Sequence, residues 1–399
     1  MIRTTGQNLS ADAQQYLFEH AFHIPEDSKN TISKWQPVLE QVKDKRIVLI
    51  GEFSHGAREV FTLRNELIRE LHEKLGFDVV LFEAGIGELI HLNEHKKEYT
   101  PGELTDGFYG IWRNKEFREL MKYIKSRDIH IAGFDIQKSG RTFDRFLQFE
   151  SKKNRDADSL YIANIENRFN TLDQKVSSSN AVYDSLVGPI QTLITDYEVL
   201  SKSWDKVKDE QKDNSALWIQ RTIINRIEYL KYRLDFAKDR DWRKRWTARD
   251  REMASNVEWL LEHFFKDKKV IIIGHNFHTA KFNEKEEVMG EFLHRKRGNE
   301  MYTIATFASK GTYHDNNGKV REMKQPSEEQ LDIKHIINIL NGKVHFVVMP
   351  QKQKKENDWL FKEIVVNDSF IDLNSSNTLT LSNSFDGMIL INAVTPPTK

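Results

Sequence analysis

The sequence contains no cysteine among its 399 residues. This absence excludes disulfides, thiolate nucleophiles and zinc sites with sulfur ligands, so any catalysis has to use His, carboxylates, hydroxyls, Lys or Arg. A net charge of one sign is also missing, because 60 Lys and Arg residues balance 60 Asp and Glu residues. With no overall positive charge to attract nucleic acid or anionic lipid, we expect no nucleic-acid partner and no membrane partner.

Long apolar runs are absent as well. The N-terminal stretch MIRTTGQNLSADAQQYLFEHAFHI has no apolar segment of the length that a signal peptide needs, and nothing downstream approaches the ~18 to 20 apolar residues of a membrane span. These absences predict a cytoplasmic protein. The 39% of hydrophobic residues are enough for a substantial core, in one large domain or two smaller ones.

Short apolar runs rich in β-branched residues predict the strands. They cover 46–50, 78–82, 130–134, 269–273 and 302–307, with a weaker run at 344–349. Most are continuous rather than alternating, which is typical of strands buried on both faces. Between the first two runs, apolar residues at 60, 63, 67, 71 and 75 predict a helix that stops at Gly76. We therefore expect an α/β fold, with a mixed, largely parallel central sheet flanked by helices.

The segment from 141 to 248 differs from the rest of the chain. It is rich in Lys and Asp, nearly free of Pro and Gly, and shows helical periodicity. We expect residues 1–140 and 249–399 to form the α/β core with an active-site crevice, and 141–248 to form a helical insertion. That insertion is either a lid or arm over the site or a plain helical layer on the core.

The stretch GEFSHG directly follows the first predicted strand. A serine nucleophile elbow requires G-x-S-x-G, but Glu52 occupies the first glycine position, which disfavours Ser54 as a nucleophile. Glu52 and His55 instead lie three residues apart at the carboxyl end of a strand, where ligands bind in open α/β sheets. A carboxylate can fix the tautomer of an imidazole and make it a general base. The alternative is that both residues only cap the next helix.

Two other predicted strands also end in titratable residues. Glu83 follows the second run, and His275 and His278 follow the run at 269–273. Because adjacent strand ends bring side chains into one crevice, we expect these residues to converge with Glu52 and His55. Arg64, on the helix that leaves the first motif, is a candidate for holding an anion or a carbonyl there; the alternative is a solvated helix residue.

Two further patterns suggest other chemistry. The spacing of His91 and His95 in HLNEH fits the inverted zinc-peptidase pattern, but the sequence offers no identifiable further ligand. Gly85 and Gly87 begin a dinucleotide fingerprint whose third glycine position is occupied by Ile90. We expect neither pattern to carry the function.

Taken together, these motifs resemble the erythromycin esterase family. The resemblance rests on GEFSHGAREVFTLRNELIRELHEKLGFDVVLFEAG, IWRNKEF, AGFDIQ, RDREMASN, IIIGHNFH and FDGMILINAVTPP, which follow the family's order. It implies a hydrolase that opens the macrolactone ester of 14-membered macrolides such as erythromycin, and so confers antibiotic resistance. The implied catalytic residues are Glu52, His55, Arg64, Glu83, His275 and His278.

The resemblance also implies a division of roles. His55 would deprotonate water, Glu52 or Glu83 would orient the imidazole or the water, and Arg64 or a histidine of the 275 and 278 pair would stabilise the oxyanion. Substrate contacts are expected from residues in or near the family blocks, with buried core positions as the alternative for the aromatic ones: Phe53, Trp112, Glu116 and Asp135.

We expect no cofactor. A divalent metal remains the alternative, because three histidines and two glutamates could bind one, but Arg64 in the same crevice would repel a cation. The expected partners are a macrolide and water. Two other functions stay open: a hydrolase of the same family that acts on another ester or amide, and a non-catalytic ligand-binding protein. The range of macrolides and the oligomeric state do not follow from the sequence.

Overall fold

The computed structural model describes residues 9–26, 33–140, 142–153, 159–178, 182–211, 214–367 and 378–399. Its contacts divide the chain into two compact units. The first unit comprises Met1–Leu81, Gly110–His130 and Leu260–Lys399, and the second comprises Phe82–Tyr109 and Ile131–Trp259. Among the described helices, none combines the length and the apolar character that crossing a membrane would require.

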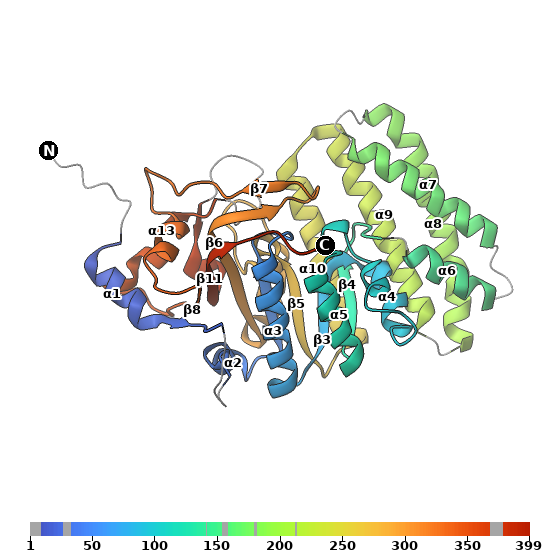
Figure 1. Cartoon of the computed structure of the whole chain (residues 1–399). Coiled ribbons are helices and arrows are strands. Elements are labelled where there is room, and N and C mark those ends of the chain that lie inside the picture. The colour runs from blue at the N-terminus through green and yellow to red at the C-terminus, as the bar shows by residue number, and fades with distance from the viewer. Residues whose placement is uncertain are drawn as a thin grey trace. The chain divides into compact units, whose positions relative to one another are not determined.

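The first unit is built on a mixed sheet (Figure 1). Its strands run in the order β1-β8-β11-β6-β2-β5, and β7 pairs with β6. The pairs β11–β6, β6–β2 and β2–β5 are parallel, whereas β8 is antiparallel to both β11 and β1. The strands are β1 (Ala21–His23), β2 (Ile47–Glu52), β5 (Lys269–His275), β6 (Met301–His314), β7 (Val320–Glu322), β8 (Val344–Val348) and β11 (Gly387–Val394), with β9 (Glu363–Val365) and β10 (Thr378–Thr380) in a separate pair. The predicted α/β class with a largely parallel sheet is confirmed.

The predicted strands agree with the structure because apolar side chains fill both faces of the sheet. Val48, Leu49 and Ile50 of β2 are at most 1% exposed. The strand β11 was not among the predicted runs, although its sequence GMILINAV is as apolar as theirs. It lies between β8 and β6, so the sheet extends further than the sequence analysis expected.

The helix α3 (Arg58–Leu75) corresponds to the helix predicted from the apolar spacing. Val60, Leu67 and Leu71 lie on its buried face. It ends where Gly76 adopts φ 72°, a left-handed conformation that costs glycine little, and the Gly76 N–H donates to carbonyls of the last turn. The other helices of this unit are α1 (Ala11–His20), α2 (Gln36–Val42), α5 (Lys115–Arg127), α11 (Asn276–Thr279), α12 (Met289–Arg297), α13 (Ile333–Asn338) and α14 (Leu381–Ser384).

The second unit is mainly helical, and α7, α8 and α9 pack against one another (Figure 1). Its elements are α4 (Ile86–Glu94), α6 (Thr142–Lys153), α7 (Ser159–Ser177), α8 (Tyr183–Gln211) and α9 (Ser215–Asp239), with the carboxyl ends of β3 (Phe77–Gly85) and β4 (His130–Asp135) and most of α10 (Trp242–His263). The segment 141–248 falls within this unit, together with 82–109, 131–140 and 249–259. Residues 141, 154–158, 179–181 and 212–213 of that segment lie outside the described residues.

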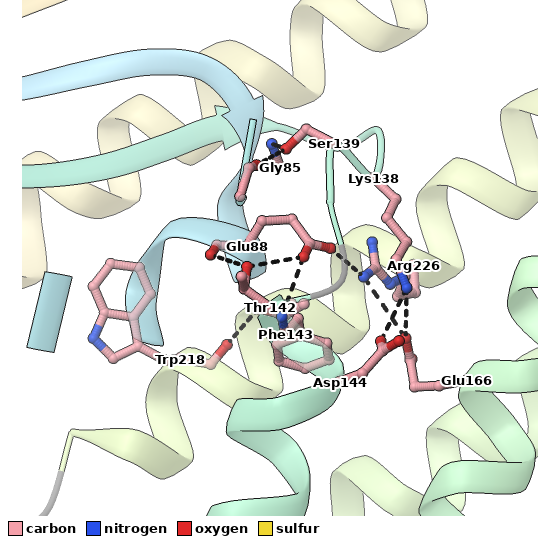
Figure 2. A network of polar contacts seen from close by, with 12 residues as sticks. Gly85, Glu88, Lys138, Ser139, Thr142, Phe143, Asp144, Glu166, Trp218 and Arg226 are labelled. Carbon is pink, nitrogen blue, oxygen red and sulfur yellow. Dashed lines mark hydrogen bonds and ion pairs between the residues drawn. The ribbon is translucent and has the colours of Figure 1, made fainter. Parts of the chain in front are cut away.

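A buried ionic network holds the second unit together (Figure 2). Glu88 of α4 is fully buried and accepts hydrogen bonds from the Phe143 N–H, at 3.1 Å, and from Arg226 Nη2, at 3.0 Å. Arg226 also lies 3.7 Å from Glu166, whose other oxygen accepts from the Tyr197 hydroxyl at 2.6 Å. Burial alone would lower the pKa of Arg226, but the Glu166 and Glu88 carboxylates raise it. The network thus links α4, α6, α7, α8 and α9 through ion pairs and hydrogen bonds.

Candidate functional site

The ends of β2 and β5 place two predicted site residues side by side. The strands are parallel, and Glu52 pairs in register with His275. Glu52 is 1% exposed, so its carboxylate is removed from solvent and has to find its partners within the protein. These partners determine the chemistry that this end of the sheet can perform.

Glu52 binds the imidazole of His55. Nδ1 of His55 lies 2.5 Å from Oε1 of Glu52. A carboxylate only accepts hydrogen bonds, so Nδ1 carries the proton, and the neutral tautomer has its lone pair on Nε2. The ring also lies near two others, with centroids 5.7 Å from those of Trp112 and His275. The Glu52 carboxylate therefore fixes the orientation of the His55 imidazole.

The second oxygen of Glu52 accepts a hydrogen bond from Nη1 of Arg64, on α3. Arg64 is 2% exposed, and its guanidinium lies 4.6 Å from the ring centroid of Phe61 and 4.8 Å from that of Trp112. Burial lowers the pKa of Arg64, and the Glu52 carboxylate opposes that shift. Glu52 therefore lies between a guanidinium and an imidazole, and both of its oxygens are engaged.

Ser54 has a role in the turn. Its hydroxyl accepts a hydrogen bond from the Gly56 N–H at 3.1 Å and donates to the His314 carbonyl at 3.4 Å. Both contacts shape the connection between β2 and α3. This geometry agrees with the expectation that Ser54 is not a nucleophile.

His275 and His278 are both buried near the end of β5. Nε2 of His275 donates to the Phe53 carbonyl at 2.8 Å, and Nδ1 accepts from the Phe277 N–H at 3.3 Å, which caps α11. His278 lies on α11, is fully buried and packs its ring against Phe277 at 5.1 Å. Both ring nitrogens of His275 therefore support the backbone at the carboxyl end of the sheet.

Three residues predicted to contact the substrate lie in the first unit: Trp112, Phe53 and Glu116. Trp112 is 1% exposed and packs edge-on against Phe117, with ring centroids 5.0 Å apart. Phe53 is 2% exposed and meets the ring of Tyr313 at 5.9 Å. The Glu116 carboxylate accepts hydrogen bonds from Thr398, at 3.0 Å from its N–H and 2.7 Å from its hydroxyl. The two aromatic residues belong to the buried wall around His55 and β2, and Glu116 anchors the end of the chain.

The second unit brings Glu83 and Asp135 together around Arg249. Nη2 of Arg249 lies 3.0 Å from Glu83 Oε1 and 2.6 Å from Asp135 Oδ2. The Tyr109 hydroxyl donates to the same Asp135 oxygen at 3.1 Å, and burial raises the pKa of Tyr109 well above its ordinary value. Burial would lower the pKa of Arg249, but Asp135 and Glu83 outweigh it and raise that pKa.

Arg249 had no assigned role in the sequence analysis. It lies in the block RDREMASN, whose first four residues are all charged. In the structure Arg249 is 5% exposed and Asp250 is fully buried, so two of these charges face the interior. A run of charges on a helix is usually solvated, and the sequence alone gave no signal that separated these two from their neighbours.

The two discounted patterns have structural roles in the second unit. Nε2 of His91 accepts from the Tyr99 hydroxyl at 2.8 Å, His95 lies 3.1 Å from Glu98, and burial lowers the pKa of His91 to about 4. Within the part of the chain that the structure describes, no group of three or more His, Asp or Glu side chains is arranged to hold a metal ion. A Cβ at Gly87 would lie 2.4 Å from Thr222 Cγ2, so this glycine permits α4 to approach α9.

Comparison with known proteins adds the family. The erythromycin esterase family model matches residues 72–394. The match contains Glu83, His275 and His278 and begins after Glu52, His55 and Arg64. The roles of these last three residues therefore depend on the geometry above.

Two curated proteins and one solved structure are similar to the chain. A Bacillus subtilis protein named "Putative hydrolase YbfO" is 25% identical over 93% of this chain and 89% of its own. The Escherichia coli "Erythromycin esterase type II" is 27% identical over 65% of this chain and 67% of its own. A mutant of the erythromycin esterase EreC in its open conformation shares the fold, with a TM-score of 0.64, 16% identity and coverage of 91% of this chain and 94% of its own. By the family match, which spans most of its length, the chain belongs to the erythromycin esterase family.

Proposed function

We propose that this protein hydrolyses a carboxylic ester with a water molecule that His55 activates. The observation that carries the proposal is the 2.5 Å contact between His55 Nδ1 and the buried Glu52 carboxylate. It directs the basic lone pair of the imidazole to Nε2, where it can accept a proton. Membership of a family named for esterases supports the same reaction type.

In the proposed reaction, His55 Nε2 takes a proton from water while the water oxygen forms a bond to the ester carbonyl carbon. The resulting tetrahedral intermediate breaks its bond to the alcohol oxygen, which receives the proton from the imidazolium. The products are a carboxylic acid and an alcohol, and no covalent enzyme intermediate forms. A well-placed general base contributes roughly 10² to 10⁴ in rate. Glu52 stabilises the imidazolium that forms in the first step.

Arg64 is proposed as a positioning residue. At 2% exposure, and with Phe61 and Trp112 against its guanidinium, it is covered from solvent, so its geometry favours holding Glu52 over contacting an oxyanion. A buried carboxylate without a cation would tend to take up a proton and lose its hold on the imidazole. Arg64 supplies a positive charge that compensates the buried Glu52 carboxylate beside His55.

We propose that this chemistry proceeds without a resident metal. The side chains at the ends of β2 and β5 that could bind a metal already have protein partners. His275 contacts backbone groups with both ring nitrogens, and Glu52 contacts His55 and Arg64 with its two oxygens. A cation placed there would also face the Arg64 guanidinium. Full activity after exhaustive chelation is the expected outcome; activity that disappears and returns with an added divalent metal would contradict this part of the proposal.

The proposed substrate is the lactone of a 14-membered macrolide such as erythromycin, and the proposed consequence is antibiotic resistance. The family match and the relative named as an erythromycin esterase support it. A second candidate is another ester or amide, because the relative that aligns with 93% of the chain is named only as a hydrolase.

The purified protein should convert erythromycin to a product that is heavier by one water molecule. Mass spectrometry measures this gain in mass. A simple chromogenic aryl ester in a parallel reaction separates the two candidates. Hydrolysis of the aryl ester without any change in a panel of macrolides would reject the macrolide substrate and leave the ester chemistry in place. Hydrolysis of neither class would reject both.

A further inference from the structure

The second unit contains a cavity of about 560 Å³ that the proposed reaction does not use. It lies at the turn between α9 and α10 and extends to the end of α7. Its wall combines three arginines with three aromatic rings: Arg233, Arg240, Arg245, Tyr229, Phe236 and Trp242. The remaining described lining residues are neutral, so the cavity wall carries positive charge without a carboxylate.

Arg245 is the lining cation with the fewest polar contacts. Within the described residues its guanidinium makes no hydrogen bond or ion pair, and it lies 4.8 Å from the ring centroid of Phe236 and 4.9 Å from that of Trp242. Burial, together with the nearby Arg233 cation, lowers the pKa of Arg245 to about 10. Two cations thus share a partly desolvated space, an arrangement that a bound anion would stabilise.

Arg233 adds a buried donor to the same cavity. It is 5% exposed, and its Nη2 donates to the Val176 carbonyl at 2.5 Å and to the Ser177 hydroxyl at 3.1 Å. Its Nε is buried, and the described residues give it no acceptor. Both partners of Nη2 are neutral, so the charge of Arg233 is not compensated by these contacts.

The acidic residues at the same turn are engaged elsewhere. Asp239 lies 2.9 Å from Lys244 Nζ, and the Asp241 carboxylate accepts from the Lys244 N–H at 3.0 Å, near the start of α10. The Asp239 carboxylate therefore pairs with Lys244, and the Asp241 carboxylate binds a backbone N–H.

The backbone conformation of Arg240 is a further observation at this cavity. Arg240 ends α9 in the left-handed region, with φ 57°, a position at which glycine is strongly favoured. An arginine there is strained relative to glycine, and its side chain lies in the cavity wall and over the ring of Phe236, at 5.6 Å. The position of the Arg240 side chain in the cavity wall would explain why an arginine occupies a backbone conformation that favours glycine.

We propose that this cavity binds an organic anion, in which a phosphate or carboxylate group meets the arginines and a planar or apolar body packs against the aromatic rings. Arginine suits both anionic groups because its planar donors match their oxygens. Phe236 and Trp242 lie with ring centroids 4.5 Å apart, and Trp242 is 43% exposed, so the apolar part of the wall is open to solvent.

The test uses calorimetric titration of the full chain with naphthyl phosphate, naphthoate, naphthol and inorganic phosphate. Naphthyl phosphate or naphthoate should bind at least about tenfold more tightly than both naphthol and inorganic phosphate. The ratio between the two naphthyl anions tells whether phosphate or carboxylate is preferred. Equal affinity for naphthol and the anions, equal affinity for inorganic phosphate and naphthyl phosphate, or no binding of either naphthyl anion would overturn the proposal.

Three variants locate the binding. Arg245→Gln should weaken binding of the preferred anion about tenfold or more, whereas Arg243→Gln, on the same helix and outside the lining, should leave it unchanged. Arg240→Gly should weaken binding several-fold while the melting temperature stays the same or rises, because the left-handed backbone is relieved. An equal effect of Arg243→Gln and Arg245→Gln would reduce the interaction to general surface charge and overturn the site.

Discussion

Two buried charge clusters, one in each unit, have different chemical capacities. In the first unit, Glu52 lies between the Arg64 guanidinium and the His55 imidazole. In the second, Arg226 lies between the carboxylates of Glu88 and Glu166 (Figure 2). The second cluster consists of a guanidinium and carboxylates, groups whose ordinary protonation ranges lie far from neutral pH. The first contains an imidazole, whose ordinary protonation range is close to neutral.

The contrast shows that burial and pairing do not by themselves mark an active site. Buried structural networks also perturb pKa values: burial raises the pKa of Glu166, and the Arg226 cation opposes that shift. What distinguishes the first cluster is an imidazole whose Nδ1 faces the Glu52 carboxylate, which leaves the lone pair of the neutral ring on Nε2, the atom proposed to accept a proton. The four predictions below test this distinction.

Replacing His55 should have the largest effect. His55→Ala removes the proposed base, so the rate of ester hydrolysis should fall by roughly 10² to 10⁴ with little change in unfolding free energy. His72→Ala is the matched control, because His72 also lies close to a carboxylate, 3.2 Å from Asp78, and should keep full activity. A His55→Ala enzyme with wild-type kcat/KM would contradict the proposed mechanism.

Replacing Arg226 should affect stability instead. Arg226→Met leaves Glu88 and Glu166 buried without their shared cation, and should lower the unfolding free energy by about 3–5 kcal/mol. Lys231→Met on the same helix breaks an exposed pair with Glu228 and should cost less than ~1 kcal/mol. Urea titration measures both. Similar losses in the two variants would mean that the buried network is not the stabilising element.

The Glu52 cluster should show energetic coupling. Arg64→Met and Glu52→Gln each leave a buried charge without its partner, whereas the double variant removes both charges. The double variant should be more stable than the sum of the single changes predicts, by roughly 0.5–3 kcal/mol in urea unfolding. Additive losses would show that the buried contact between these two residues contributes nothing of its own.

The smallest expected effect is the pH dependence due to His91. Its pKa falls from 6.5 to about 4 on folding, so between these values the unfolded chain binds a proton that the folded chain does not. The protein should therefore lose stability as the pH falls from neutral to 4, by about 1–2 kcal/mol after allowance for solvent screening. His91→Gln should reduce the difference in unfolding free energy between pH 7 and pH 4.5. An unchanged difference would contradict the assignment.

Local patterns explain which parts of the fold were predictable. The apolar spacing from Val60 to Leu75 and the stop at Gly76 predict α3, because both depend on backbone geometry within a few residues. The contact between Glu52 and His55 is local in the same sense, since three residues separate them in a tight turn after β2. The predicted runs do not include the strand β11, although its sequence GMILINAV is apolar.

The partners of the charged residues were not predictable in this way. Arg249 meets Glu83 across 166 residues of sequence, and Arg226 meets Glu88 across 138. Nothing near Arg226 in NRIEYL distinguishes it from a solvated helix residue. Which arginine is buried depends on how α9 packs against α4, and that packing is decided by the whole unit.

The sequence by itself determined the α/β class, the main strands, the family resemblance and the close spacing of Glu52 and His55, because each depends on periodicity or order along the chain. Only the tertiary structure decided that Arg64 is the buried partner of Glu52, that His275 uses its ring nitrogens on the backbone, and that three arginines meet three aromatic rings at the turn after α9. The physical reason is desolvation: a charge needs a specific partner only when packing removes it from water, and packing joins residues that are distant in sequence.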